Sequence, residues 1–249
     1  MNTYRWGIVG LGRIAHKFAE ALKVIPTAQL VAVASRDRKN AEAFAERFEA
    51  KTFYDNYEDL ILDKEVDIVY IATTHPSHAS LAKACLRFGK PVLCEKPFAM
   101  NYQQAKEVYE VARESGVFIM EALWTRFLPS MKRVIDIVKK EEIGHVVSIQ
   151  ADFGFKAPYD PGARLFNKEL GGGALLDVGI YPVFLTTALL GEPAKIQANG
   201  LNYQVAEVHK CLDEGKTESD LWSYGDSLLV LKTLDRIREK IGLKYEADI

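Results

Sequence analysis

Cysteine is scarce in this sequence of 249 residues. Cys85, Cys94 and Cys211 are too few and too scattered for a disulfide framework, and no C-x-x-C pair is present to bind zinc. This shortage excludes a small disulfide-stabilised secreted fold and indicates a reducing compartment. No group of His, Asp and Glu residues has metal-ligand spacing, so we expect no metal site.

An excess of charge of either sign is missing as well. The chain has 32 basic and 34 acidic side chains and a formal net charge of -2. This balance excludes the broad basic footprint of a general nucleic-acid binder. The composition, 48% hydrophobic and 27% charged, argues against disorder and predicts a globular protein with no nucleic-acid partner.

Long uninterrupted apolar runs are also absent. The first residues, MNTYRWGIVGLGRIA, lack the basic segment and apolar stretch of a signal peptide. The most apolar stretch, 173–190, carries Asp177 and Pro182 in its middle, which favours a buried helix over a membrane span. We therefore expect a cytoplasmic protein without a membrane partner.

The first half of the chain alternates between strand and helix patterns. Such alternation predicts a mainly parallel sheet that is covered by helices on both faces. Asn101 is placed to cap a helix that ends before Gly116, with Gln104 at the capping-box position. The predicted strands are 4–9, 29–34, 51–54, 68–72, 91–94 and 117–122, and the predicted helices are 13–22, 40–48, 77–88 and 102–115.

After Trp124 the pattern changes, and we place a domain boundary near 122–128. A partly alternating run at 146–155, VVSIQADFGF, predicts a strand with one buried face. A second strand is expected at 195–198. Helices are predicted at 129–140, 172–190, 204–214 and 225–241.

The motif Gly10-Leu-Gly12-Arg-Ile-Ala15 lies between the first predicted strand and the first predicted helix. It has the G-x-G-x-x-A form of a dinucleotide-binding fingerprint. Gly10 permits a tight turn, Gly12 lets the backbone approach a pyrophosphate, and Ala15 allows close packing of the helix on the sheet. We expect Gly10, Gly12, Arg13 and Ile14 to contact the cofactor, although glycines are also common in plain turns.

The end of the second strand bears on which dinucleotide binds. NAD would be held there by an acidic residue, but the sequence places Ser35 and Arg36 at this point, and a guanidinium suits the 2′-phosphate of NADP. NADP is therefore favoured, with NAD as the alternative. The other interpretation is that Arg36 and Arg38 form a solvated face while Asp37 caps the next helix.

Glu95-Lys96-Pro97 closes the fifth predicted strand at its carboxyl end, where ligands bind in doubly wound sheets. A lysine in that position can be desolvated and tuned toward neutrality, as proton transfer requires. Taken alone, the tripeptide is equally typical of a surface turn.

Five segments together resemble the Gfo/Idh/MocA family of oxidoreductases, and within it the group of dimeric dihydrodiol dehydrogenases and NADP-dependent D-xylose dehydrogenases. They follow the family order over about three-quarters of the chain. The segments are GIVGLGRIA (7–15), VASRD (33–37), THPSHASLAKACLRFGKPVLCEKPFAMN (74–101), MEALWTRFLP (120–129) and GGGALLDVGIYPV (171–183). The resemblance implies a Rossmann-type doubly wound parallel sheet in residues 1–122, followed by a shortened α+β domain in residues 123–249.

The resemblance also implies catalytic roles for Lys96, Asp177 and Tyr181. Hydride would pass between a nicotinamide and a secondary alcohol of a sugar or cyclic diol, while Lys96 or Tyr181 handles the hydroxyl proton. Asp177 and Tyr181 are four residues apart, so on a helix they share one face. A lysine beside the phenol would lower its pKa. The alternative is that Tyr181 packs in the core and Asp177 pairs with a lysine structurally.

Other positions are implied to line the site. Two groups are involved, one beside the cofactor and one on the substrate side, where the aromatic residues could equally be interdomain core. Glu95 is expected to bond the nicotinamide ribose or to orient Lys96. The remaining cofactor residues are Thr73, His75, Pro76 and His78, and the substrate residues are Trp124, Arg126 and Phe127.

The second half departs from the family pattern. Gly200-Leu201-Asn202-Tyr203 leads directly into a helical C-terminal segment, so several consecutive strands are missing at about 199–203. The family normally has a large, mostly antiparallel sheet in this half, and that sheet is its usual subunit contact. A homodimer through the C-terminal sheet is the partner that the resemblance implies, and the missing strands leave this quaternary structure open. The alternative function is therefore a dinucleotide-binding regulator without turnover.

Overall fold

The computed structural model describes residues 3–196, 208, 210–221 and 223–242. The chain falls into two compact units, residues 1–192 and 193–249. Residues 123–192 belong to the first unit. The predicted division into domains of 1–122 and 123–249 stays a prediction.

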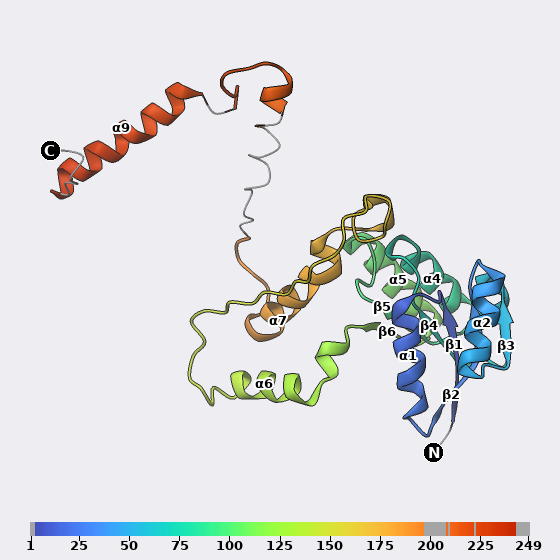
Figure 1. Cartoon of the computed structure of the whole chain (residues 1–249). Helices are drawn as coiled ribbons and strands as arrows, with labels where there is room; N and C mark the ends of the chain where they lie inside the picture. Colours follow the sequence, from blue (N-terminus) through green and yellow to red (C-terminus); the bar gives the residue numbers. More distant parts are fainter. Residues whose placement is uncertain (1–2, 197–207, 209, 222, 243–249) are drawn as a thin grey trace. The chain divides into compact units, whose positions relative to one another are not determined.

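Six strands form one sheet in the first unit, in the order β3-β2-β1-β4-β5-β6 (Figure 1). All neighbouring strands are parallel, and this order is that of the doubly wound dinucleotide-binding sheet. The predicted fold class is thus confirmed for this half. The strands are β1 (Tyr4–Val9), β2 (Ala28–Ala34), β3 (Thr52–Tyr54), β4 (Ile68–Ile71), β5 (Val92–Glu95) and β6 (Ile119–Ala122).

Helices cover both faces of this sheet (Figure 1). One face packs on α1 and α2, whose apolar residues recur at helical spacing, as Ala15, Ala19 and Leu22 do in α1. The other face packs on α3, α4 and α5, around residues such as Leu60 and Leu86. These helices are α1 (Arg13–Lys23), α2 (Arg38–Phe48), α3 (Tyr57–Leu62), α4 (His78–Arg87) and α5 (Tyr102–Ser115).

The predicted start and end of α5 are confirmed. The Asn101 side chain accepts a hydrogen bond from the Gln104 amide at 2.9 Å, and Gly116 ends the helix at a φ of 65°. The Gln104 side chain, however, bonds the Met100 amide rather than that of Asn101. Helix α3 was not predicted from the sequence.

The predicted strand at 146–155 is wrong. These residues form no strand, and most of them are exposed. A strand needs a partner to satisfy its backbone groups, and the described part of the second half offers none. The alternating pattern therefore indicates a strand that lacks its neighbours.

The long apolar helix is shorter and more exposed than predicted. A π-helical turn, Leu175–Gly179, leads into α7 (Ile180–Leu190), and α7 has no buried residue. The expectation of a buried helix is therefore wrong for this structure. By length and composition alone, Lys168–Leu190 could cross a membrane, which is weak evidence because core helices of soluble proteins pass the same test.

The remaining helix of the first unit, α6 (Pro129–Lys139), matches its prediction. In the second unit, residues 208 and 210–213 are helical, within the predicted helix 204–214. The helix predicted at 225–241 is confirmed as α9 (Tyr224–Ile241). Residues 195 and 196 are not in a strand, and 197–207, including the proposed junction at 199–203, lie outside the described residues.

Candidate active site

The site lies at the carboxyl edge of the sheet, where β1 and β4 are neighbours. The turn after β1 packs directly on the end of β4. Gly10 has a φ of +86°, and a Cβ there would lie 2.8 Å from the Thr73 amide nitrogen. Only glycine combines this conformation with this approach, so Gly10 serves the turn that the motif predicts.

The first turn of α1 is open to an anionic ligand. Gly12 begins the helix, no side chain caps it, and a Cβ on Gly12 would meet open space. By contrast, Asp37 and Asn101 cap α2 and α5 with their side chains. Arg13 and Ile14 lie exposed in the same turn. Uncapped amides at a helix N-terminus suit a pyrophosphate, so these residues fit a dinucleotide.

Ser35 and Asp37, which follow β2, have different hydrogen-bond partners. Asp37 accepts hydrogen bonds from the Lys39 and Asn40 amides and caps α2. Ser35 is buried, and its hydroxyl accepts from the Asp37 amide and the Asn40 side chain. Asp37 is thus engaged by its own helix through Oδ1.

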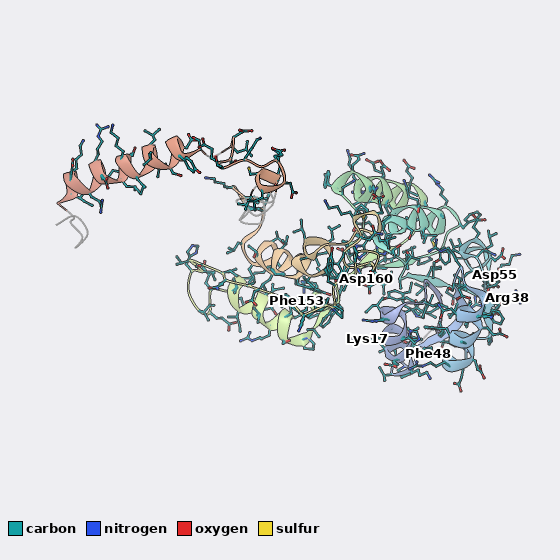
Figure 2. The ribbon with its side chains drawn as sticks, turned by 45° about the horizontal axis from the view of Figure 1, so that its top comes forward. Lys17, Arg38, Phe48, Asp55, Phe153 and Asp160 are labelled. Atoms are coloured by element: carbon teal, nitrogen blue, oxygen red, sulfur yellow. The ribbon has the colours of Figure 1, made fainter. Side chains whose placement is uncertain are left out.

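Two arginines flank this cap. Arg38 pairs with Asp55 at 3.3 Å, and Figure 2 shows the two labelled side chains together. Arg36 is exposed, and no hydrogen bond or ion pair joins it to the part of the chain that the structure describes. Arg36 is therefore available to a ligand. Arg38 instead fits the other interpretation given above, in which it forms part of a solvated surface.

Lys96 follows β5 and reaches across to a segment 81 residues later. Its Nζ donates to the Asp177 carbonyl at 2.5 Å and lies 3.8 Å from Asp177 Oδ1. The same Nζ lies 5.1 Å from the centre of the Tyr181 ring. The structure therefore brings together the three residues predicted to be catalytic.

The protonation behaviour of this trio differs from the sequence-based expectation. Burial lowers the pKa of Lys96, against the attraction of the Asp177 and Glu95 carboxylates. Burial raises the pKa of Tyr181. Lys96 faces the ring rather than the hydroxyl, whose oxygen accepts from Trp124 Nε1 at 3.0 Å. The pKa of Tyr181 is thus raised, where the sequence analysis expected the lysine to lower it.

Arg164 is a member of the site that the sequence analysis missed. Its Nη1 donates to Asp177 Oδ1 at 2.9 Å and lies 3.4 Å from His75 Nε2. A single arginine in a polar loop carries no periodic or motif signal. Only its position 13 residues before Asp177, in a loop that folds back, brings it here.

Three long-range contacts fasten the later segment to the sheet edge. His75, after β4, donates from Nδ1 to the Gly171 carbonyl at 3.0 Å. Lys96, after β5, contacts Asp177, and Trp124, after β6, bonds Tyr181. The segment thus crosses the ends of three adjacent strands in their spatial order.

Glu95 and His78 are bound within the protein. Glu95 accepts from the buried Tyr70 hydroxyl at 2.5 Å and from the Lys96 amide at 3.1 Å. His78 is fully buried and lies within 3.1 Å of the carbonyls of Pro97 and Thr73. This geometry favours the interpretation that Glu95 orients Lys96, and it gives His78 a packing role rather than a ligand contact.

The remaining predicted positions are spread more widely. Pro76 is exposed beside His75. Trp124 and Phe127 are about half-exposed. The ring of Phe153 (labelled in Figure 2) is tilted by 58° to that of Tyr181, with 5.0 Å between the ring centres. Arg126 instead lines a surface hollow over α6. Of the three residues predicted on the substrate side, Trp124 is the one that bonds Tyr181.

Comparison with known proteins identifies the family. Residues 4–123 match the oxidoreductase family with an NAD-binding Rossmann fold, and residues 131–220 match the GFO/IDH/MocA C-terminal domain. The chain belongs to the Gfo/Idh/MocA oxidoreductase family. This confirms the resemblance stated from the motifs.

Several relatives are named dehydrogenases or reductases. The trans-1,2-dihydrobenzene-1,2-diol dehydrogenase of Danio rerio is 41% identical over 219 residues, 86% of this chain and 62% of that protein. The human enzyme of the same name is 38% identical over 204 residues, 80% of this chain and 60% of that protein. The chain therefore spans about six-tenths of the length of these relatives.

Solved structures agree with this assignment. KijD10, a 3-ketoreductase from Actinomadura kijaniata in complex with NADP and TDP-benzene, superposes with a TM-score of 0.71 at 34% identity, over 76% of this chain and 58% of that one. A putative NADPH-dependent oxidoreductase from Desulfitobacterium hafniense gives a TM-score of 0.69 at 27% identity, over 76% and 55%.

Proposed function

We propose that this chain is an NADP-dependent oxidoreductase that acts on a secondary alcohol of a sugar or cyclic diol. The observation that carries the proposal is the cluster of Lys96, Asp177 and Tyr181 at the sheet edge next to the open turn of α1. Relatives named diol dehydrogenases and a ketoreductase with bound NADP support it. Cys85 and Cys94 are buried thiols outside any disulfide, which is consistent with the predicted cytoplasmic location.

In this proposal, one group of residues binds the cofactor and another transfers the proton. The amides of the first turn of α1 hold the pyrophosphate, and Arg36 pairs with the 2′-phosphate. A bound nicotinamide supplies the hydride chemistry. Neutral Lys96 takes the proton from the substrate hydroxyl, while Asp177 holds the Lys96 side chain in position and Tyr181 covers it.

A second candidate is a dinucleotide-binding regulator without turnover. It is favoured by the missing strand at 146–155 and by the chain's length relative to its family. The two candidates agree on cofactor binding and differ on catalysis.

The first test is a titration of the purified protein with NADPH and NADH, followed by nicotinamide fluorescence. NADPH-selective binding is expected. Arg36→Gln should weaken NADPH about ten- to a hundredfold, as expected for the loss of a charge-assisted hydrogen bond, and leave NADH unchanged. Arg38→Gln is the matched control, because Asp55 already holds that guanidinium.

The second test is turnover with D-xylose and with trans-dihydrodiols. Turnover supports the oxidoreductase. Tight NADPH binding without turnover on either class would support the regulator instead. No binding of either dinucleotide would contradict both.

A further inference from the structure

Arg164 is held in a loop that closes on itself. The Asn167 amide bonds the Ala163 carbonyl at 3.0 Å, and the Gly173 amide bonds the Leu165 carbonyl at 2.9 Å. These bonds fix the main chain on both sides of Arg164. The guanidinium therefore reaches the site from a defined backbone, although its side chain is 40% exposed.

Two cations share one carboxylate oxygen. Arg164 Nη1 lies 2.9 Å from Asp177 Oδ1, and Lys96 Nζ lies 3.8 Å from the same atom. The shorter contact belongs to the arginine. Lys96 donates instead to the Asp177 carbonyl, an acceptor that carries no formal charge to pair the ammonium.

The other titratable groups that the structure describes around Lys96 make no ion pair with its Nζ. Glu95 attracts the ammonium through space, but its carboxylate is bonded by Tyr70 and by the Lys96 amide. Glu121 accepts from the Phe98 amide, and burial raises the pKa of its carboxyl. Burial lowers the pKa of the His75 and His78 rings and raises the pKa of the Tyr181 phenol, so burial favours the uncharged form of all three.

We propose that Arg164 is a positioning residue that occupies the Asp177 carboxylate and thereby leaves the Lys96 ammonium incompletely paired, so that Lys96 gives up its proton more readily. The sign follows from two effects that act together. Arg164 repels the ammonium directly, and it also withdraws the Asp177 charge from it. Removal of the guanidinium therefore makes the lysine harder to deprotonate.

The test measures the titration of Lys96 without any need for turnover. Each lysine is labelled with a trace of acetic anhydride between pH 6 and pH 11, and the extent of labelling is read by mass spectrometry. Lys90 is the internal reference, because it precedes β5 at the opposite end of the strand and donates to the carbonyls of Asp63 and Val66.

In Arg164→Gln, the labelling midpoint of Lys96 is expected to rise by about one pH unit, an approximately tenfold loss of reactivity on the acidic limb. Lys90 should not move. Arg164→Lys retains a cation and should restore the midpoint at least in part. An unchanged or lowered midpoint in Arg164→Gln would overturn the proposal, and so would a Lys90 profile that collapses to that of the urea-unfolded chain, since Arg164 would then be structural.

Asp177→Asn tests the shared carboxylate independently of Arg164. Its loss should lower the Lys96 midpoint, because the attracting charge is gone, and an unchanged midpoint would contradict the sharing. The catalytic consequence rests on the proposed function: the pH profile of kcat should move with the labelling midpoint. A chain that binds NADPH without turnover would remove that function while leaving the labelling result intact.

Discussion

At the residue scale, the central side chain is Lys96. Its ammonium is mostly buried, with 15% of the side chain exposed, and burial lowers its pKa. Burial therefore makes the neutral amine, the form that accepts a proton, available at a lower pH than in an exposed lysine. Tyr181 cannot do so as easily, since burial raises its pKa.

This difference predicts unequal effects of substitution. Lys96→Met should lower kcat about 10²- to 10⁴-fold, the usual contribution of a positioned acid or base, and should leave NADPH affinity nearly unchanged. Tyr181→Phe keeps the ring over Lys96 and should cost less. Steady-state kinetics and fluorescence titration measure both, with Lys106→Met on the surface of α5 as the control. A larger loss in Tyr181→Phe than in Lys96→Met would reverse the assignment.

His75 predicts an acid-sensitive stability. Burial lowers its pKa to about 4, whereas in the unfolded chain histidine titrates near 6.5, at about the usual value. The unfolded state therefore binds the proton first as pH falls, and the free energy of unfolding should decrease between about pH 6.5 and pH 4, by about 1–3 kcal/mol. Urea unfolding at several pH values measures this.

His75→Asn cannot gain that proton and should flatten part of the dependence. The difference between the two proteins isolates His75 from other groups that titrate in the same window. Parallel pH curves for the two would refute the prediction.

At the element scale, the glycine run 171–173 shapes the loop that faces the sheet. Gly171 has a φ of +72°, and a Cβ there would lie 2.9 Å from His75 Nδ1 and 3.0 Å from Met100 Sδ. The backbone conformation and the close approach both require glycine. Without it, the carbonyl that accepts from His75 could not stay in place.

Gly171→Ala is expected to destabilise the protein by about 2–3 kcal/mol, from left-handed strain and overpacking together. Gly89→Ala is the matched control, because Gly89 has the same φ of +72° with nothing near its Cβ. It should cost only about 1 kcal/mol. Denaturant unfolding compares the two, and equal losses would show that the contact with His75 contributes nothing.

Whether an element could be predicted from the sequence depends on whether its stability comes from local signals or from distant partners. Helices such as α1 and α5 follow from apolar spacing and from capping residues such as Asn101, which are local signals. The strand pattern at 146–155 is equally local, but a strand is stable only beside a partner that no local pattern supplies. Lys96, Asp177 and Tyr181 were found through family motifs, whereas Arg164 depends on tertiary folding of an irregular loop and left no signal.

At the scale of the whole first unit, α7 presents an apolar surface to solvent. Val183 and Leu190 are 53% and 52% exposed, and Leu175 in the preceding turn is 72% exposed. Exposed apolar surface of this kind promotes association.

We therefore expect concentration-dependent self-association, measured by sedimentation velocity. Val183→Lys should reduce it. Val24→Lys, at an exposed position directly after α1, is the control and should have no effect. A chain that stays monomeric at all concentrations would contradict this expectation.

The three contacts between the sheet edge and the later segment have a consequence for how the site is assembled. Residues 75, 96 and 124 meet residues 171, 177 and 181 in the same order along both stretches. A shift of the later stretch by one helical turn would therefore misplace all three partners at once. Proton transfer should therefore be lost completely when the two stretches are misaligned, rather than weakened in steps. The turn between β1 and α1 takes no part in these contacts, so its affinity for the dinucleotide should be the same in either alignment.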